Sequence, residues 1–153
     1  MPGVPNLHQP SMGSTAALVS PIPREEWCIL RSAYPNVLLA GTHVAISAAL
    51  AALHFSVRQP VVTWWAAGPL VLPSLPSSGT LVLREVDLLA WEDQERLMDW
   101  LEQVWGKVQV VSTTCLPLFR LVERGDFLDT LYYRLNPLYI VTADGTGDRQ
   151  RLG

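Results

Sequence analysis

Residues that could do chemistry are few in this sequence and lie far apart. Lys107 is the only lysine among the eleven Lys and Arg residues, so any chemistry that needs an ammonium group is limited to one position. His43 and His54 stand apart from other metal-ligating residue types, and we expect a loop position and a core position rather than a metal site. Cys115 has no His or Asp beside it in the chain, which favours a small buried residue over a nucleophile.

The second cysteine, Cys28, forms no CxxC motif with Cys115. This spacing supports neither a disulfide scaffold nor a zinc site, and it is typical of proteins in a reducing compartment. No secretory signal can be recognised in the first residues, which contain prolines and no basic start. We therefore expect a cytoplasmic protein.

The composition is that of one globular domain. The 153 residues are 49% apolar and 16% charged, and the net charge of -3 argues against binding to nucleic acid or to an anionic membrane surface. No charged residue occurs between Arg31 and Arg58 or between Arg58 and Arg84. Both stretches are long enough to span a bilayer, but prolines and polar residues interrupt them, so buried strands and a buried helix are expected instead.

Strand patterns alternate with helical patterns along the chain. We expect helices at 24–32, 45–57, 92–105, 117–124 and 126–135, and strands at 36–40, 61–65, 80–83, 108–113 and 138–142. This alternation predicts a three-layer α/β domain with a mainly parallel five-stranded sheet. The 61–65 segment (VVTWW) has the composition of a buried strand. The tryptophans at 64, 65, 91, 100 and 105 are expected to fill the core or an interface.

Three regions follow from these patterns. Residues 1–23 are rich in Pro, Ser and Gly and are expected to form a flexible leader. Residues 24–142 would form the α/β core, and residues 143–153 a polar tail.

Two segments carry a family resemblance. Gly79–Glu102 (GTLVLREVDLLAWEDQERLMDWLE) and Phe127–Asn136 (FLDTLYYRLN) resemble the AAA+ ATPase domain of bacterial sigma-54-dependent transcriptional activators, whose patterns there are GTLFLDE and FREDLYYRLN. Asn36–Phe55 aligns more weakly with that family's first strand and phosphate loop. The resemblance implies a P-loop/AAA+-like core. It also implies the family's role, in which a ring of subunits couples ATP hydrolysis to remodelling of sigma-54 RNA polymerase.

The phosphate loop departs from the family pattern. Such a loop uses glycines to point backbone N-H groups at phosphate, with one lysine on the β and γ phosphates. In Gly41–Ala48 (GTHVAISA), Gly41 and Thr42 occupy the start of the loop, but Val44 and Ile46 replace glycines and Ser47 replaces the lysine. We expect phosphate binding to be lost or severely weakened.

The Walker B strand ends in Arg84-Glu85 rather than Asp-Glu. An arginine at the position of a metal-linked carboxylate repels Mg, although it could contact an anion directly. Glu85 matches the family's catalytic glutamate, but without its partners it is expected to be a solvated carboxylate or to pair with Arg84. Cys115 stands where the family has a sensor asparagine and cannot supply the same hydrogen bonds.

The family pattern has two arginines that can contact the ATP of a neighbouring subunit, and one of them is present in this sequence. Leu128 replaces the first, and Arg134 matches the second. Two interpretations stay open for Arg134: contact with a neighbouring subunit's nucleotide, or a surface ion pair with Asp126 or Asp129.

Further parts of the family are not found in this sequence. There is no GAFTGA-like loop between His54 and Gly79, so direct contact with sigma-54 is not expected. Only Gly106 and Lys107 stand where the family has a supporting insertion. The residues after Asn136 are too few for the helical lid domain, which we expect to be absent.

The sequence therefore predicts a noncatalytic sigma-54-activator-type core that acts as a protein-interaction or regulatory module linked to transcription. Its partners would be AAA+ activator subunits or a second copy of itself, with no nucleic acid, membrane, metal or cofactor. One alternative is a weak ATPase that holds ATP and Mg with Gly41, Thr42, Ser47, Arg84 and Glu85. Another is a structural relic without a partner.

Overall fold

A parallel sheet lies at the centre of the fold. The computed structural model describes residues 22–66, 68–74 and 78–142. The five strands lie in the order β2-β3-β4-β1-β5, and every neighbouring pair is parallel. Their bounds are β1 (Val37–Ala40), β2 (Val61–Trp65), β3 (Gly79–Arg84), β4 (Val108–Thr114) and β5 (Leu138–Val141). The predicted three-layer α/β architecture is confirmed.

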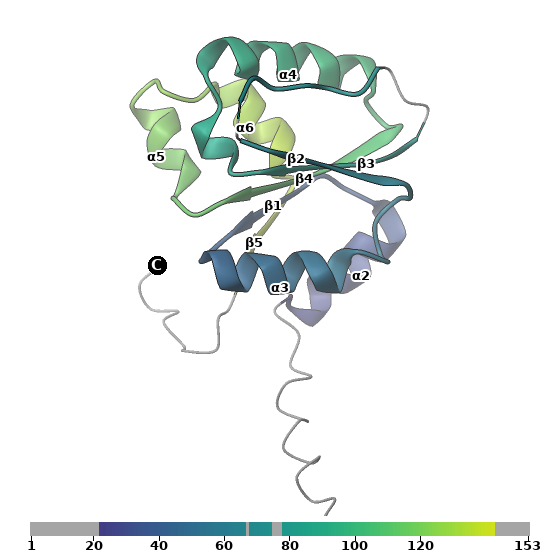
Figure 1. The fold of residues 1–153 in the computed structure, drawn as a ribbon. Coiled ribbons are helices and arrows are strands. Elements are labelled where there is room, and N and C mark those ends of the chain that lie inside the picture. Colours follow the sequence, from purple (N-terminus) through teal and green to yellow (C-terminus); the bar gives the residue numbers. More distant parts are fainter. Residues whose placement is uncertain (1–21, 67, 75–77, 143–153) are drawn as a thin grey trace, which may run out of the picture.

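Helices cover both faces of the sheet (Figure 1). One face carries α2 (Arg24–Ala33) and α3 (His43–Leu53), and the other carries α4 (Trp91–Gln103), α5 (Leu118–Glu123) and α6 (Asp129–Leu135). A short 3-10 helix, η1 (Val86–Leu88), follows β3. Because strand side chains alternate between faces, β1 sends Val37 and Leu39 toward α2 and α3 and sends Leu38 toward α4 and α6.

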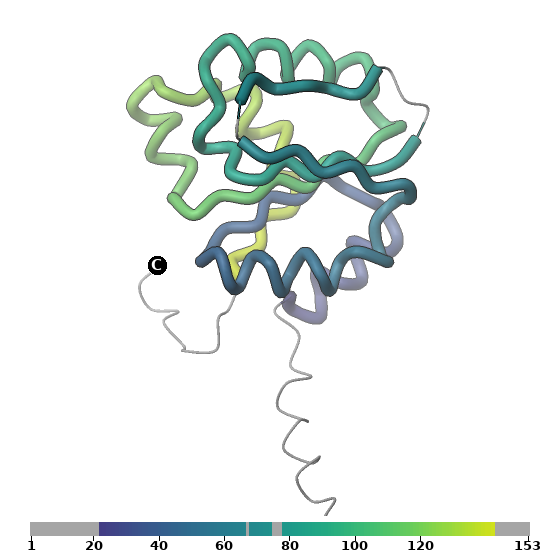
Figure 2. The backbone as a smooth tube through the Cα atoms, in the orientation of Figure 1, coloured from purple at the N-terminus to yellow at the C-terminus, as the bar shows by residue number. Residues whose placement is uncertain are grey.

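The crossover from β2 to β3 contains no helix in its described residues. Residues 68–74 return beneath α4, as the backbone in Figure 2 shows. Leu70 is buried there, Arg96 donates to its carbonyl oxygen at 3.0 Å, and Trp100 Nε1 donates to the Pro73 carbonyl oxygen at 2.9 Å. This segment covers the α4 side of β2 and leaves its α3 side open.

β2 is consequently an edge strand and not the buried strand that its composition predicts. The Val62 side chain is 50% exposed and that of Trp65 is 54% exposed. An open groove of about 500 Å³, here called the α3–β2 groove, lies between the strand and the end of α3. Its lining includes Leu50, Phe55, Val61, Thr63, Trp65 and Arg84. Of the tryptophans expected to fill the core or an interface, Trp100 is buried in the core, whereas Trp65, Trp91 and Trp105 are exposed.

Several predicted boundaries shift. The helix expected at 45–57 begins at His43 and ends at Leu53, so His54 is an exposed residue beyond its end and not a core residue. The helix expected from 126 begins at Asp129. Ile22, assigned to the leader, is buried in the core beside α2 and α3. Residues 1–21 of the leader and all of the predicted tail lie outside the described residues. None of the helices described is long and apolar enough to cross a membrane.

Candidate functional site

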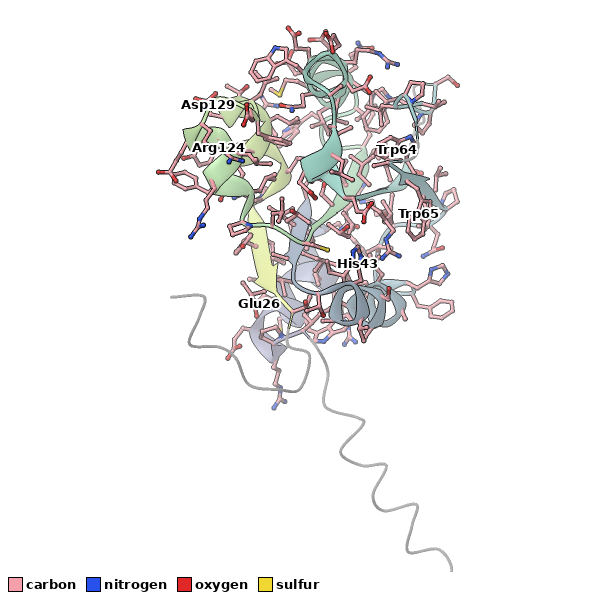
Figure 3. The ribbon with its side chains drawn as sticks, turned by 60° about the vertical axis from the view of Figure 1, so that its left-hand side comes forward. Glu26, His43, Trp64, Trp65, Arg124 and Asp129 are labelled. Atoms are coloured by element: carbon pink, nitrogen blue, oxygen red, sulfur yellow. The ribbon has the colours of Figure 1, made fainter. Side chains whose placement is uncertain are left out.

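The predicted site residues meet where β1, β3 and β4 end. Gly41 follows β1, and Cys115 follows β4. Arg84 is the last residue of β3, and Glu85 comes directly after it. In open parallel sheets, ligands bind at the carboxyl ends of the strands. His43 lies at the start of α3, close to these strand ends (Figure 3).

The segment at the phosphate-loop position is helical from His43 onward. Thr42 caps the helix, because its Oγ1 accepts a hydrogen bond from Ala45 N at 3.1 Å and its carbonyl oxygen accepts one from Ile46 N at 2.9 Å. These N-H groups are thereby engaged by the helix. Val44 is 78% exposed, whereas Ile46 is buried on the opposite side of the helix and anchors it to the fold.

Gly41 is required by packing at this turn. A Cβ at this position would collide with Thr142 Oγ1. That hydroxyl donates to the Ala40 carbonyl oxygen at 3.1 Å, and Gly41 N donates to the Thr114 carbonyl oxygen at 3.2 Å. The glycine therefore has a structural reason that involves no ligand.

Arg84 reaches across to α3. Its Nη2 donates to Ser47 Oγ at 3.3 Å, and its guanidinium lies 4.1 Å from the centre of the Trp65 ring. The buried Nε atom has no hydrogen-bond partner among the residues that the structure describes. Arg84 and Ser47, which the sequence places in two separate motifs, are thus in direct contact.

Glu85 turns toward His43 and not toward Arg84. Its backbone adopts a left-handed conformation, with φ at 61°, and its N-H donates to Thr113 Oγ1 at 3.0 Å. Its Oε1 atom lies 3.7 Å from His43 Nε2. The pairing with Arg84 that the sequence suggested is replaced by a contact with this exposed imidazole.

Cys115 is exposed, which corrects the prediction of a buried residue. Its Sγ lies 3.6 Å from His43 Nε2 and 3.7 Å from Nδ1. Partial burial of the thiol raises the pKa of Cys115, the carboxylates of Asp87 and Glu85 raise it further, and the Arg84 guanidinium opposes them. A raised thiol pKa disfavours the reactive thiolate at neutral pH.

This Cys-His-Glu cluster does not have the geometry of a catalytic triad. In a triad the histidine meets the nucleophile with one ring nitrogen and the carboxylate with the other. Here Nε2 is the nitrogen nearest to both Cys115 and Glu85. Within the described part of the chain, no three or more His, Cys, Asp or Glu side chains are grouped so that they could hold a metal ion.

Arg134 lies away from this site, near the amino ends of the strands. It lies in the last turn of α6 near the start of β1, where Asn36 Nδ2 donates to its carbonyl oxygen at 3.0 Å. Its Nη2 lies 4.0 Å from Glu102 Oε1, and its guanidinium lies 4.9 Å from the centre of the Trp105 ring. The observed ion pair is with Glu102 rather than with Asp126 or Asp129.

A family model and solved structures match this chain. The family model described as the sigma-54 interaction domain matches residues 66–144. NtrX from Brucella abortus, in a structure with ATP, is similar at a TM-score of 0.63 and 18% identity, over 87% of this chain and 40% of that one. The P-loop NTPase domain of the Sigma-54 transport activator from E. coli is similar at a TM-score of 0.58 and 21% identity, over 78% of this chain and 92% of that one.

These comparisons differ in what they carry. At such identities the structural likeness shows the fold alone, and the chain spans only about 40% of the length of the NtrX chain. No sequence among curated proteins matches this chain significantly. The family model covers β3, α4, β4, α5, α6 and β5, and its match begins after the phosphate-loop segment.

Proposed function

This chain belongs to the family of sigma-54 interaction domains, and we propose that it acts as a noncatalytic AAA+ core. Its role would be that of a protein-interaction or regulatory module linked to transcription. The proposal has two parts, the loss of nucleotide chemistry and the retention of a protein partner, and each has its own test.

The contact between Arg84 and Ser47 carries the first part. These residues stand at the family positions of the Mg-linked aspartate and the phosphate-binding lysine, and they bind each other at 3.3 Å. A cation at the first position repels Mg, and a neutral hydroxyl at the second cannot neutralise triphosphate charge. The residues present therefore do not fit Mg-ATP.

The start of α3 supports the same conclusion. A phosphate loop needs free N-H groups that converge on one anion. The Ala45 and Ile46 N-H groups instead bond to Thr42, and the Ile46 side chain is buried, which opposes unwinding of the helix start. Binding a triphosphate here would require breaking these contacts first.

Thermal unfolding in the presence of Mg-ATP or Mg-ADP tests this part. A ligand that binds only the native state stabilises it by about 2.7 kcal/mol at about 100 times its Kd. We expect no change in Tm up to millimolar nucleotide and no release of inorganic phosphate, with an active P-loop ATPase as the positive control. A saturable rise in Tm that Arg84→Gln abolishes would contradict the proposal.

The second part concerns the partner. We propose an AAA+ activator subunit or a second copy of this chain, since the sequence lacks the GAFTGA-like loop for direct sigma-54 contact. Added protein is expected to change the ATPase rate or the oligomer size of an activator. If neither quantity responds over a wide range of ratios, an activator subunit is not the partner, and self-association is the interaction that is left.

One observation favours a second candidate function, weak ATP binding. Arg84 Nε is buried and lacks a hydrogen-bond partner in the described part of the structure, so an anion that reached it would gain a donor. Gly41, Thr42, Ser47 and Glu85 would line the same site. The nucleotide titration above separates the two functions, because only this candidate predicts a Tm rise that depends on Arg84.

A further inference from the structure

β2 has an uncharged outer edge that no strand pairs with among the described residues. In the described residues it pairs only with β3, and no charged residue occurs between Arg58 and Arg84. Exposed edge strands are usually protected by charges, by bulges or by a covering segment. Residues 68–74 lie under α4, and among the described residues only β3 pairs with the strand, so its outer edge is available for pairing. Figure 3 shows Trp64 and Trp65 at this margin of the molecule.

The hydrogen-bond pattern with β3 fixes which groups point outward. Thr80 N donates to the Pro60 carbonyl oxygen at 2.9 Å, and Val61 stands beside Thr80 in the register. In a parallel ladder, the residues on either side of Val61 then turn their backbone groups toward β3. The N-H and C=O groups of Val61, Thr63 and Trp65 therefore point away from the sheet.

We propose that two copies of this chain pair through β2, antiparallel, about a two-fold axis at Thr63. This register sets Thr63 opposite Thr63 of the second copy and Val61 opposite Trp65 of the second copy. All three residues present both backbone groups to the partner strand, as the hydrogen-bonded positions of an antiparallel ladder require. The edge is thus complementary to itself.

Side chains favour the same register. Val61, Thr63 and Trp65 all line the α3–β2 groove and so share one face of the strand. The pairing joins a β-branched residue to an aromatic one and threonine to threonine, both of which stabilise antiparallel pairs, and it brings no like charges together. On the other face Val62, half exposed in the single chain, would lie opposite Trp64 of the second copy.

A second copy fits better than an open-ended assembly. Pairing of β2 with itself is isologous and stops at two chains, whereas pairing of β2 with the β5 edge would continue into filaments. Strands of five residues bury less surface than a standard stable interface. The dimer should therefore form and dissociate with protein concentration. This inference rests on the proposed function, because it selects one of the two partners named there, a second copy of this chain. It does not depend on nucleotide binding, and its failure would leave an activator subunit as the partner.

Charge-swap variants at the symmetry axis test it. Sedimentation velocity on the full chain over a wide concentration range is expected to show a reversible dimer and no larger species. Thr63→Lys and Thr63→Glu each place like charges opposite one another and should raise the dimer Kd at least about tenfold, while an equimolar mixture of the two recovers wild-type association. Thr63→Val keeps the backbone groups and should associate like the wild type.

Tyr139→Lys provides the matched control, because it adds the same charge on β5 at the other edge of the sheet. It should leave the dimer unchanged. Thermal unfolding verifies that each variant is folded, and the recovery in the mixture shows this independently. The proposal is overturned by a wild-type chain that stays monomeric, by filaments sensitive to Tyr139→Lys, or by a mixture that associates no better than its components.

Discussion

The Cys115 thiol lies against the His43 imidazole, with Sγ 3.6 Å from Nε2, although the two residues are 72 positions apart. They meet because β1 and β4 are parallel neighbours. The first turn of α3 and the residue after β4 therefore share one edge of the sheet. This contact gives the candidate site a measurable reporter.

The pH dependence of Cys115 alkylation should reflect the charges around it. In a Cys28→Ser background only Cys115 reacts, and because the thiolate is the nucleophile, the reaction should require a higher pH than in the urea-unfolded chain. Glu85→Gln removes a nearby negative charge and should shift the profile to lower pH, whereas Arg84→Gln should shift it to higher pH. A folded-state profile at lower pH than the unfolded one would mean that His43 activates the thiol.

The Thr42 cap should contribute measurably to stability. Thr42→Ala removes the acceptor for Ala45 N and should cost about 0.5 to 2 kcal/mol in the free energy of unfolding. Thr42→Ser keeps the hydroxyl and serves as the control, and denaturant unfolding measures both. Equal stabilities for the two variants would show that the start of α3 does not depend on this cap.

Asn36 should be among the costly polar positions. It is buried, its Nδ2 donates to the Arg134 carbonyl oxygen at 3.0 Å, and its Oδ1 accepts from Val110 N at 2.8 Å. Asn36→Ala leaves those buried groups without their partner and should cost about 1 to 3 kcal/mol. Ser32→Ala, which removes only exposed hydrogen bonds to the Cys28 and Ile29 carbonyl oxygens, should cost much less. Similar losses in chemical denaturation would argue against this account of Asn36.

Variants at Arg134 distinguish a structural role of this residue from a functional one. Its contacts with Glu102 and Trp105 are partly solvent-exposed, so Arg134→Ala should lower the free energy of unfolding by no more than about 1 kcal/mol. If it acts in trans, the same variant should lose the effect of this chain on an activator's ATPase rate, with Arg134→Lys only partly restoring it. An effect that both variants retain in full would leave Arg134 as a surface ion pair.

The pattern of elements could be predicted from the sequence, whereas the exposure of β2 could not. Strand and helix periods are local properties, and they place every observed strand. Whether VVTWW is central or at an edge depends on what covers it, and that depends on the path of residues 66–78. The composition of a buried strand and that of an apolar edge prepared for a partner are the same.

The candidate site, too, could be predicted from the sequence only in part. The strand ends identify Gly41, Arg84 and Glu85, but contacts of His43 with Cys115 and Glu85 join residues distant in the chain. The early start of α3 did have a local signal, because a threonine before a run of helix-forming residues is a favoured N-cap. The resemblance to a phosphate loop assigns the same residues to a turn and therefore conflicts with that signal.

The close packing of Gly41 against Thr142 gives this glycine a structural role that is independent of any ligand. Thr142, the residue after a neighbouring strand, occupies the space where a Cβ would lie, so the sheet requires this glycine whether or not the loop binds a ligand. Where a sequence signature and a steric requirement coincide in this way, the presence of the glycine is evidence of architecture and not by itself of catalysis.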